Sequence, residues 1–362
     1  MELTGKVEHV LVTSSAPLTR AYDLAMLDLD GVVYVGPHAV DGAAEGIAAA
    51  REAGMRVAFI TNNAARSPDA VAAHLTELGV PAQAHDVVTS AQAAARLARD
   101  RWGAGARVVA VGGPGLWTAL REAGLEPVGA ADEAVAVVTG YGPDVVWHDL
   151  TRVAVRIRDG LPWVASNTDY SMPTAYGVAP GHGVQVEMLS RFSAVTPDVA
   201  GKPERPLLDE TVRRIGGERP LMVGDRLDTD IEGARKAGFD SLLVLTGVTG
   251  LAELVAARDE LRPTYLATDL GGLCVAHQAP ERRDGAWVLG GWSATCDGGR
   301  LVVRRVAAGG GDGAEPAAGD WWRVVATAAW SHLDATGEPA DVTGVDVPDV
   351  ADAGEGADAV DA

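Results

Sequence analysis

The chain has 362 residues, 47% of them hydrophobic and 22% charged, which is enough for two or three folded domains of roughly 100–200 residues each. Its net charge of −20 argues against a nucleic acid or an anionic membrane surface as the main partner. No run of about 18 uncharged apolar residues exists to span a membrane. Two cysteines, Cys274 and Cys296, are too few for a disulfide framework, and residues 1–20 lack the apolar core of a secretion signal. These features predict a cytoplasmic globular protein.

The first two-thirds of the chain alternates short apolar runs with Ala-rich stretches of helical character, which is typical of a parallel α/β sheet. The predicted strands cover residues 24–27, 56–60, 108–111, 134–138, 163–165, 221–223 and 241–245. The predicted helices cover residues 41–53, 68–78, 116–123, 149–158 and 228–237. The fold class expected from this order is α/β with a Rossmann-like parallel sheet.

Composition changes after about residue 268. Five of the nine tryptophans fall between Trp287 and Trp330, and residues 321–332 have the pattern of an amphipathic helix. We expect residues 268–335 to form a small module that docks on the main body, because so short a segment buries little on its own. From Asp334 to the C-terminus there are nine acidic residues and no Lys or Arg, so we expect residues 336–362 to be disordered.

Two carboxylates directly follow the first predicted strand. Asp28 and Asp30 are separated by one residue, so in an extended chain they project the same way, and a bound cation would hold them together. The carboxyl end of a strand is also where open α/β sheets bind ligands. Taken alone, Asp30-Gly31 is equally an ordinary turn signal.

A second acidic group follows the strand at residues 221–223. Asp225 holds the same position on its strand as Asp28 does on the first one, and Asp228 and Asp230 lie at the start of the next helix. Helix capping accounts well for Asp228 but poorly for Asp225.

Polar groups suited to a phosphate occur at two further places. Thr61, Asn62 and Asn63 follow the strand at 56–60, where hydroxyl, amide and backbone N–H groups suit phosphate oxygens. Lys202, between Gly201 and Pro203, has the charge to balance a phosphate. Taken alone, a polar strand end explains Thr61, Asn62 and Asn63 about as well, and a surface lysine in a loop is the better explanation of Lys202.

In this order, however, the four segments resemble the four motifs of the haloacid dehalogenase (HAD) superfamily of phosphatases. The segment Asp28 to Tyr34, with Thr61-Asn62-Asn63, is similar to the type IIA, NagD-like and nitrophenyl phosphatase branch. The resemblance covers residues 21–267 and implies a core of residues 21–89 and 189–267. An α/β cap that sets substrate specificity would be inserted at residues 90–188, and residues 1–20 would precede the core.

The resemblance implies a role for each motif residue. Asp28 would be the nucleophile that forms an aspartyl-phosphate, and Asp30 the general acid and base. Mg²⁺ would be held by the Asp28 carboxylate, the Asp30 backbone carbonyl and Asp225. Lys202 would neutralise Asp28 and the phosphate together.

The remaining motif residues would act around that centre. Thr61 and Asn62, with Asn63 beside them, would hold the phosphate oxygens, and Asp230 and, less directly, Asp228 would support the metal from behind.

The cap carries a segment that resembles the substrate-facing loop of the branch, in which Asn167 and Asp169 match an Asn-x-Asp pattern. Relatives that act on pyridoxal phosphate tend to carry His where this chain has Met172, which disfavours that substrate. His182 departs from the small residue usual between two glycines. We expect it to be an exposed loop histidine, with substrate contact as the alternative.

The tryptophan-rich module resembles a truncated GNAT-type acetyltransferase fragment. Such an extension occurs on high-G+C bacterial relatives regarded as glycerol 3-phosphate phosphatases. The favoured hypothesis is therefore a Mg²⁺-dependent phosphatase for glycerol 3-phosphate, a small-molecule phosphoester, with phosphoglycolate, nucleotides or pyridoxal phosphate as alternative substrates. A non-catalytic phosphate-binding or regulatory protein is the alternative of a different class. Because relatives often pair through their caps, a homodimer is also expected.

Overall fold

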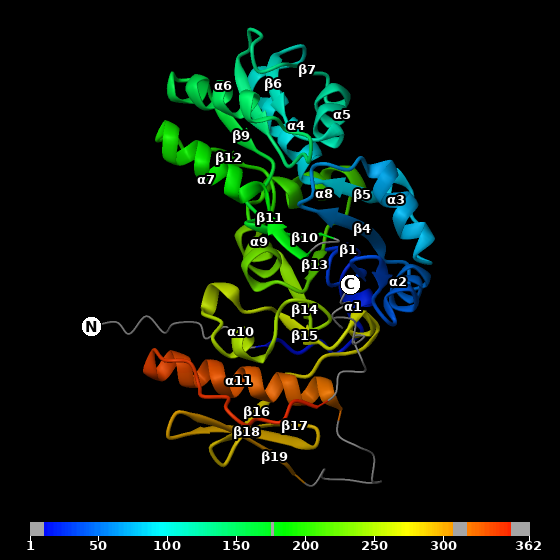
Figure 1. The fold of residues 1–362 in the computed structure, drawn as a ribbon. Helices are drawn as coiled ribbons and strands as arrows, with labels where there is room; N and C mark the ends of the chain where they lie inside the picture. The colour runs from blue at the N-terminus through cyan, green and yellow to red at the C-terminus, as the bar shows by residue number, and fades with distance from the viewer. Residues whose placement is uncertain (1–10, 175–176, 307–316, 349–362) are drawn as a thin grey trace, which may run out of the picture.

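The computed structural model describes residues 11–174, 177–306 and 317–348. Its larger domain is built on a six-stranded sheet in the order β15-β14-β13-β1-β4-β5, with all neighbouring strands parallel (Figure 1). The strands are β1 (Leu24–Leu27), β4 (Arg56–Thr61), β5 (Val87–Thr89), β13 (Pro220–Gly224), β14 (Asp240–Val244) and β15 (Tyr265–Ala267). The expected α/β fold with a parallel sheet is thus confirmed.

Helices cover both faces of this sheet. They are α2 (Ala43–Glu52), α3 (Pro68–Glu77), α8 (Pro206–Ile215) and α9 (Glu232–Ala237). In β1 all four residues are buried, because Ala25 and Leu27 pack toward α2 and α3 while Leu24 and Met26 pack toward α8 and α9. This two-sided burial explains why the strands appear in the sequence as continuous apolar runs.

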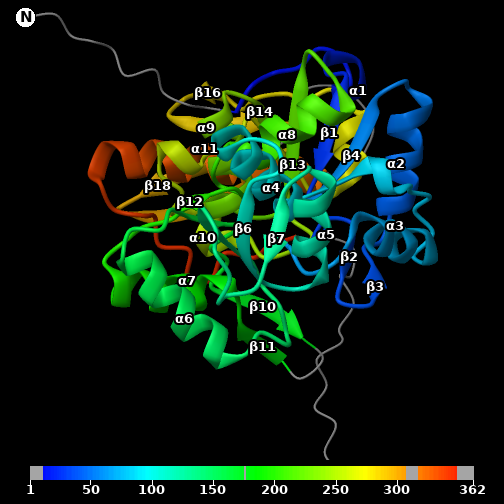
Figure 2. The ribbon, with the colours of Figure 1, turned by 90° about the horizontal axis from the view of Figure 1, so that it is seen from above.

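A smaller domain lies above the larger one in Figure 1. Its five-stranded parallel sheet has the order β12-β9-β8-β6-β7. Its strands and helices are β6 (Arg107–Val111), β7 (Glu126–Val128), β8 (Ala136–Thr139), β9 (Trp163–Ala165), β12 (Asp198–Val199), α4 (Ser90–Trp102), α5 (Pro114–Glu122), α6 (Trp147–Arg158) and α7 (His182–Ser193). A hairpin, β10 (Ser171–Thr174) with β11 (Gly177–Pro180), extends from this domain, and Figure 2 shows it below β6 and β7 and away from the six-stranded sheet.

The boundaries of this domain differ from the predicted 90–188. Strand β12 pairs with β9, so the smaller sheet extends beyond residue 188. Helix α4 packs against both α5 of the smaller domain and α8 of the larger one. Alanines on several sides of α4 are buried, and an Ala-rich sequence alone does not show which domain such a helix joins.

The C-terminal module is an antiparallel sheet covered by one long helix. Its elements are β16 (Glu281–Arg283), β17 (Ala286–Leu289), β18 (Trp292–Asp297), β19 (Arg300–Arg305) and α11 (Ala318–Thr336). Helix α11 lies between this sheet and the larger domain (Figure 1). Trp321 and Trp330 are buried in a cluster that also contains Leu227, Ile231 and Leu254 of the larger domain. The module and the larger domain therefore share one hydrophobic core.

The expected disorder from residue 336 onward is wrong for residues 336–348. Ala340 is buried, Val342 and Val345 pack against the shared core, and Asp341 forms a backbone bridge with Arg300. These apolar side chains give the segment enough to bury despite its acidic composition. Residues 349–362 lie outside the described ranges.

At the other end of the chain, Ser14 pairs with His277, and the N–H of Val12 donates to the Thr264 carbonyl. The segment before the first helix, α1 (Leu18–Ala21), thus lies beside the last strand of the large sheet. Within the ranges given above, no helix is both long and apolar enough to cross a bilayer.

Candidate active site

Three carboxylates meet at the carboxyl edge of the large sheet. Asp28 follows β1 and Asp225 follows the neighbouring β13, so the parallel pairing of the two strands brings them together. Asp230 comes from the single π-helical turn Leu227–Ile231 that follows β13. Carboxylate oxygens of these three residues all lie within 4.8 Å of one another. We call this group the carboxylate cluster.

The cation of the cluster is Lys202. Its Nζ lies 2.8 Å from Asp28 Oδ1 and 2.7 Å from Asp230 Oδ1, and its side chain is only 2% exposed. Burial alone would lower the pKa of Lys202, but Asp230 and Asp28 outweigh it and raise that pKa above its ordinary value. Interpretation as an ordinary surface lysine is therefore wrong.

Asp225 has the acceptor geometry of a metal ligand. Its Oδ2 accepts the Val248 N–H at 2.7 Å, whereas its Oδ1 is buried and has no hydrogen-bond partner among the described residues. Burial, with Asp230 and Asp28 nearby, raises the pKa of Asp225 to about 8. One lysine between three carboxylates leaves net negative charge, and a hard divalent cation bound by oxygen ligands fits both that charge and the unpaired Oδ1.

Glycines allow the backbone to press against Asp225. Gly31 has φ +85°, and a Cβ there would lie 2.4 Å from Asp225 Oδ2; at Gly247 the distance would be 2.0 Å. Thr246 Oγ1 donates to the Gly31 carbonyl at 2.6 Å. The segment 246–249 was not singled out from the sequence, although Thr246-Gly247 directly after a predicted strand was a usable signal.

Asp30 lies at the exposed side of the cluster. Desolvation by the surrounding protein raises its pKa, with Arg66 and Lys202 opposing that effect. Arg66 was not singled out from the sequence, and no motif pointed to it.

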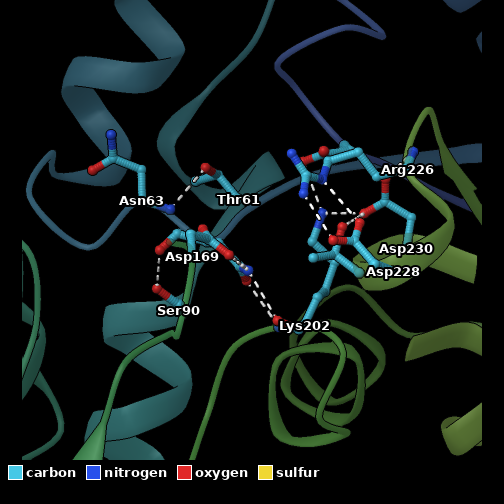
Figure 3. A network of polar contacts seen from close by, with 11 residues as sticks. Thr61, Asn63, Ser90, Asp169, Lys202, Arg226, Asp228 and Asp230 are labelled. Carbon is cyan, nitrogen blue, oxygen red and sulfur yellow. Dashed lines mark hydrogen bonds and ion pairs between the residues drawn. The ribbon is translucent and has the colours of Figure 1, made fainter. Parts of the chain in front are cut away.

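Asp228 lies outside the cluster. It forms a two-bonded ion pair with Arg226, from Nε at 3.1 Å and Nη2 at 2.8 Å (Figure 3). Arg226 also lies close enough to Asp169 and Asp230 to interact with both carboxylates. Arg226 was not singled out from the sequence, although it stands directly after Asp225.

Thr61, the last residue of β4, and Asn63 interact mainly with their own loop, where Thr61 Oγ1 accepts the Asn63 N–H at 3.0 Å. Asn62 instead links distant segments. Its Nδ2 donates to Asp169 Oδ1 at 2.9 Å and to the Lys202 carbonyl at 3.0 Å, and its Oδ1 accepts the Lys202 N–H at 2.8 Å. Its own carbonyl accepts from Ser90 Oγ at 2.5 Å. The Asn62 amide is therefore committed to holding Asp169 and the Lys202 backbone.

Asn167 and Asp169 bring the smaller domain to this edge. Asn167 Nδ2 donates to the Asn62 carbonyl at 2.6 Å, and its Oδ1 accepts the Asp169 N–H at 3.2 Å. Burial raises the pKa of Asp169, while the hydrogen bond from Asn62 opposes that shift.

His182 is not an exposed loop residue as expected. It is the first residue of α7, is 1% exposed, and its Nδ1 lies 2.9 Å from the Asn167 carbonyl. Burial lowers the pKa of His182 to about 4, so its ring is neutral at physiological pH.

Comparison with known proteins identifies the family of the chain. The family model described as haloacid dehalogenase-like hydrolase matches residues 25–126, and a HAD-hydrolase-like model matches residues 199–273. Among curated relatives, the D-glycerol 3-phosphate phosphatase of Mycobacterium tuberculosis is 42% identical over 294 residues, 79% of each chain. An acid sugar phosphatase of Staphylococcus aureus is 35% identical over 69% of this chain and 96% of its own.

Solved structures agree. The glycerol phosphate phosphatase of M. tuberculosis in complex with calcium superposes with a TM-score of 0.77 at 40% identity, over 91% of this chain and 93% of that one. The same enzyme with magnesium gives 0.76 at 40% identity, over 87% and 92%. A 4-nitrophenylphosphatase of Thermotoga maritima gives 0.66 at 28% identity, over 71% and 98%. The chain belongs to the haloacid dehalogenase-like hydrolases, among the phosphatases of that superfamily.

Proposed function

We propose that this protein hydrolyses glycerol 3-phosphate, with Mg²⁺ as cofactor and an aspartyl-phosphate formed on Asp28. The observation that carries the proposal is the carboxylate cluster, in which Lys202 bridges Asp28 and Asp230 beside the unpaired Oδ1 of Asp225. The choice of glycerol 3-phosphate as substrate rests on the 42% identity with the mycobacterial D-glycerol 3-phosphate phosphatase.

Residues of the cluster would hold the metal. We assign its ligands to the carboxylates of Asp28 and Asp225 and to the backbone carbonyl of Asp30. Asp230 would support the site from behind, because its two oxygens already accept hydrogen bonds from Lys202 and from the Arg226 N–H. When bound, Mg²⁺ offsets the negative charge of the phosphate and of the cluster.

In the first chemical step, an Asp28 oxygen forms a bond to phosphorus as the bond to the leaving alcohol oxygen breaks. Lys202 offsets charge on Asp28 and on the phosphate. Asp30 gives its proton to the leaving oxygen and then takes a proton from the water that cleaves the aspartyl-phosphate. The raised pKa of Asp30 favours the protonated form that the first step needs.

Phosphate oxygens would be held by the Thr61 hydroxyl and the backbone N–H of Asn62, since the side chain of Asn62 is already committed. Asn63 would support that loop because its Oδ1 accepts a hydrogen bond from the Ala65 N–H. We place substrate selection in the smaller domain, residues 90–188 with β12 added. There, Asp169 would accept a hydrogen bond from a hydroxyl of the glycerol moiety, and Asn167 would position Asp169.

We propose a structural role for the C-terminal module, as a truncated GNAT-like fold. Its four-stranded antiparallel sheet and single long helix support that likeness. The mycobacterial structure covers 91% of this chain, against 71% for the nitrophenylphosphatase, so the additional segment is shared with the former.

We also propose that the chain is a cytoplasmic homodimer. Trp147 and Val155 of α6 and Phe192 of α7 are exposed apolar side chains on two helices that pack together, and burial of such side chains favours association. Cys274 and Cys296 are both free thiols, which suits a reducing compartment. Light scattering on the purified protein at several concentrations gives the oligomeric state directly.

The test of function is phosphate release from a panel of phosphomonoesters, with Mg²⁺ and with EDTA. The panel contains glycerol 3-phosphate, phosphoglycolate, pyridoxal phosphate, nucleoside monophosphates and 4-nitrophenyl phosphate. We expect Mg²⁺-dependent release with a preference for glycerol 3-phosphate of about tenfold or more, which is worth about 1.4 kcal/mol. Preference for another ester would keep the mechanism and change the substrate. No release from any ester by folded, Mg²⁺-binding protein would favour a phosphate-binding protein instead.

Substitution of the nucleophile gives a second test. Asp28→Asn should reduce turnover to below about 1% of wild type, because an amide is a far weaker nucleophile than a carboxylate. Asp144→Asn, at an exposed position of the smaller domain, is the matched control and should keep full turnover. An Asp28→Asn protein that keeps more than a few percent of wild-type turnover would remove Asp28 from its assigned role.

A further inference from the structure

We propose that His182 is a positioning residue for substrate binding: its Nδ1–H holds the Asn167 carbonyl and so fixes the loop 167–170 that presents Asp169 to the active site. This inference rests on the proposed function for its kinetic test but not for its structural one. It concerns a residue that, as the first of α7, lies outside all four catalytic motifs.

The contact with Asn167 fixes the tautomer of the His182 imidazole. A carbonyl oxygen only accepts hydrogen bonds, so the 2.9 Å contact requires that Nδ1 carries the proton. Nε2 is then an acceptor, and it is buried without a hydrogen-bond partner among the described residues. Burial lowers the pKa of His182 to about 4, so the neutral ring with its proton on Nδ1 is the form present at neutral pH.

The start of α7 packs closely against the loop 167–170. A Cβ on Gly181 would lie 2.3 Å from the Asp169 carbonyl oxygen, and one on Gly183 would lie 2.3 Å from that of Thr168. The Gly183 N–H donates to the Asp169 carbonyl at 2.8 Å. The two glycines therefore bring the backbone against the loop, and the side chain between them reaches Asn167.

Hydrogen bonds of Asn167 and Asn62 connect this loop to Lys202 at the carboxyl edge of the large sheet. Asn167 donates to the Asn62 carbonyl and accepts from the Asp169 N–H. Asn62 in turn donates to Asp169 Oδ1 and exchanges two hydrogen bonds with the Lys202 backbone. His182 thus holds one end of a continuous set of bonds that orients the Asp169 carboxylate against Lys202.

The unpaired Nε2 is a cost that the histidine carries for its Nδ1–H. An apolar side chain of similar size would remove that buried acceptor, but it would leave the buried Asn167 carbonyl without its donor. What an apolar side chain cannot supply is the donor to the Asn167 carbonyl, and that donor is the feature we assign to function.

The experiment compares three variants of the full chain. His182→Leu removes the donor, and His182→Asn keeps a donor of similar reach. His148→Leu is the control, because the His148 side chain is exposed on α6. For His182→Leu we expect KM for glycerol 3-phosphate to rise about tenfold while kcat changes less than threefold, because Asp169 binds the alcohol part rather than the reacting phosphorus. His182→Asn should restore KM to within about twofold of wild type, and His148→Leu should not change it.

Hydrogen–deuterium exchange gives a readout that needs no turnover. In His182→Leu the amides of Asp169 and Gly183 should exchange at least about tenfold faster, while those of β1 keep wild-type protection. If the wild type hydrolyses no glycerol 3-phosphate, the proposed substrate fails, but this exchange measurement still tests the loop.

Unchanged KM and unchanged exchange in His182→Leu would overturn the proposal. So would equal KM increases in His182→Leu and His182→Asn, because the donor would then not be the relevant feature. If His182→Leu does not fold while His182→Asn does, the bond is a general stability contact, and the positioning role is likewise rejected.

Discussion

At the scale of single residues, close packing around Asp225 predicts a strong effect of adding one methyl group. Gly247→Ala would place a Cβ 2.0 Å from Asp225 Oδ2 and displace the segment whose Val248 N–H donates to that oxygen. We expect Mg²⁺ affinity to fall at least about tenfold, or about 1.4 kcal/mol, measured by titration of activity or by calorimetry. Gly319→Ala, where the nearest atom is 3.9 Å away, is the control. Wild-type Mg²⁺ affinity in Gly247→Ala would show that this loop does not position Asp225.

His182 also predicts a pH dependence of stability. Its pKa is about 4 in the folded protein against 6.5 when unfolded, so between these values the unfolded chain binds the extra proton. The stability that the neutral, buried ring provides is therefore present above pH 6.5 and is lost as the pH falls toward 4, by about 3 kcal/mol in total.

His182→Asn has no such group to titrate. We therefore expect the free energy of unfolding to fall by about 3 kcal/mol less in the variant than in wild type between pH 7 and pH 4. Chemical denaturation at each pH measures the difference, and other titrating groups cancel in it. Parallel pH curves for the two proteins would contradict the burial of a neutral ring at this position.

At the scale of elements, one ion pair ties α11 to the larger domain. The buried guanidinium of Arg262 donates to both carboxylate oxygens of Asp334 at 2.7 Å and lies over the ring of Trp330. Asp334→Asn replaces the two charged carboxylate oxygens that accept from Arg262 with one neutral amide oxygen. We expect a loss of about 1–2 kcal/mol, because the aspartate is partly exposed to solvent.

Thermal unfolding should show this as a lower Tm with unchanged KM. Asp297→Asn, on an exposed strand end of the same module, should leave Tm within about 1 °C of wild type. If both variants have the same Tm, the ion pair does not stabilise the docking of α11.

The bounds of individual elements also show what local sequence patterns predict and what they do not. Strands β1 and β9 were predicted at their observed bounds, because a buried parallel strand is an apolar run that needs no partner to be recognised. The predicted helix at 228–237 instead begins as the π-turn Leu227–Ile231, which directs Asp230 to Lys202 and leaves Asp228 with Arg226. Helical spacing cannot show that turn, because it depends on a lysine from a distant segment.

At the scale of the whole molecule, the shared core predicts that the module and the larger domain unfold together. Trp330 donates its Nε1–H to the Leu254 carbonyl at 2.7 Å, within the cluster that includes Leu227 and Ile231, the first and last residues of the π-turn. Trp330→Ala should lower the free energy of unfolding by about 3–5 kcal/mol, while Val35→Ala, at an exposed position, changes it by less than about 0.5 kcal/mol.

Differential scanning calorimetry is the measurement. A single transition that includes both parts, shifted to lower temperature in Trp330→Ala, is the expected result. A separate module transition that alone responds to Trp330→Ala would show that the two parts fold independently.

The sequence by itself determined the parallel α/β sheet and the residues at its carboxyl edge, among them Asp28, Thr61 and Asp225. Both follow from neighbours in the chain: apolar runs make strands, and polar residues directly after them lie at the edge where ligands bind. The tertiary structure decided that Asp230 rather than Asp228 joins the cluster, and that the Asn62 amide holds Asp169 and Lys202.

It also decided that His182 is buried and that residues 336–348 pack on the module. These outcomes depend on contacts between segments that are more than 10 residues apart in the chain, as in the bond from His182 to Asn167, which are separated by 15 residues. Local composition and spacing carry no information about such contacts, because burial and hydrogen bonding at one position are set by whatever the fold brings against it.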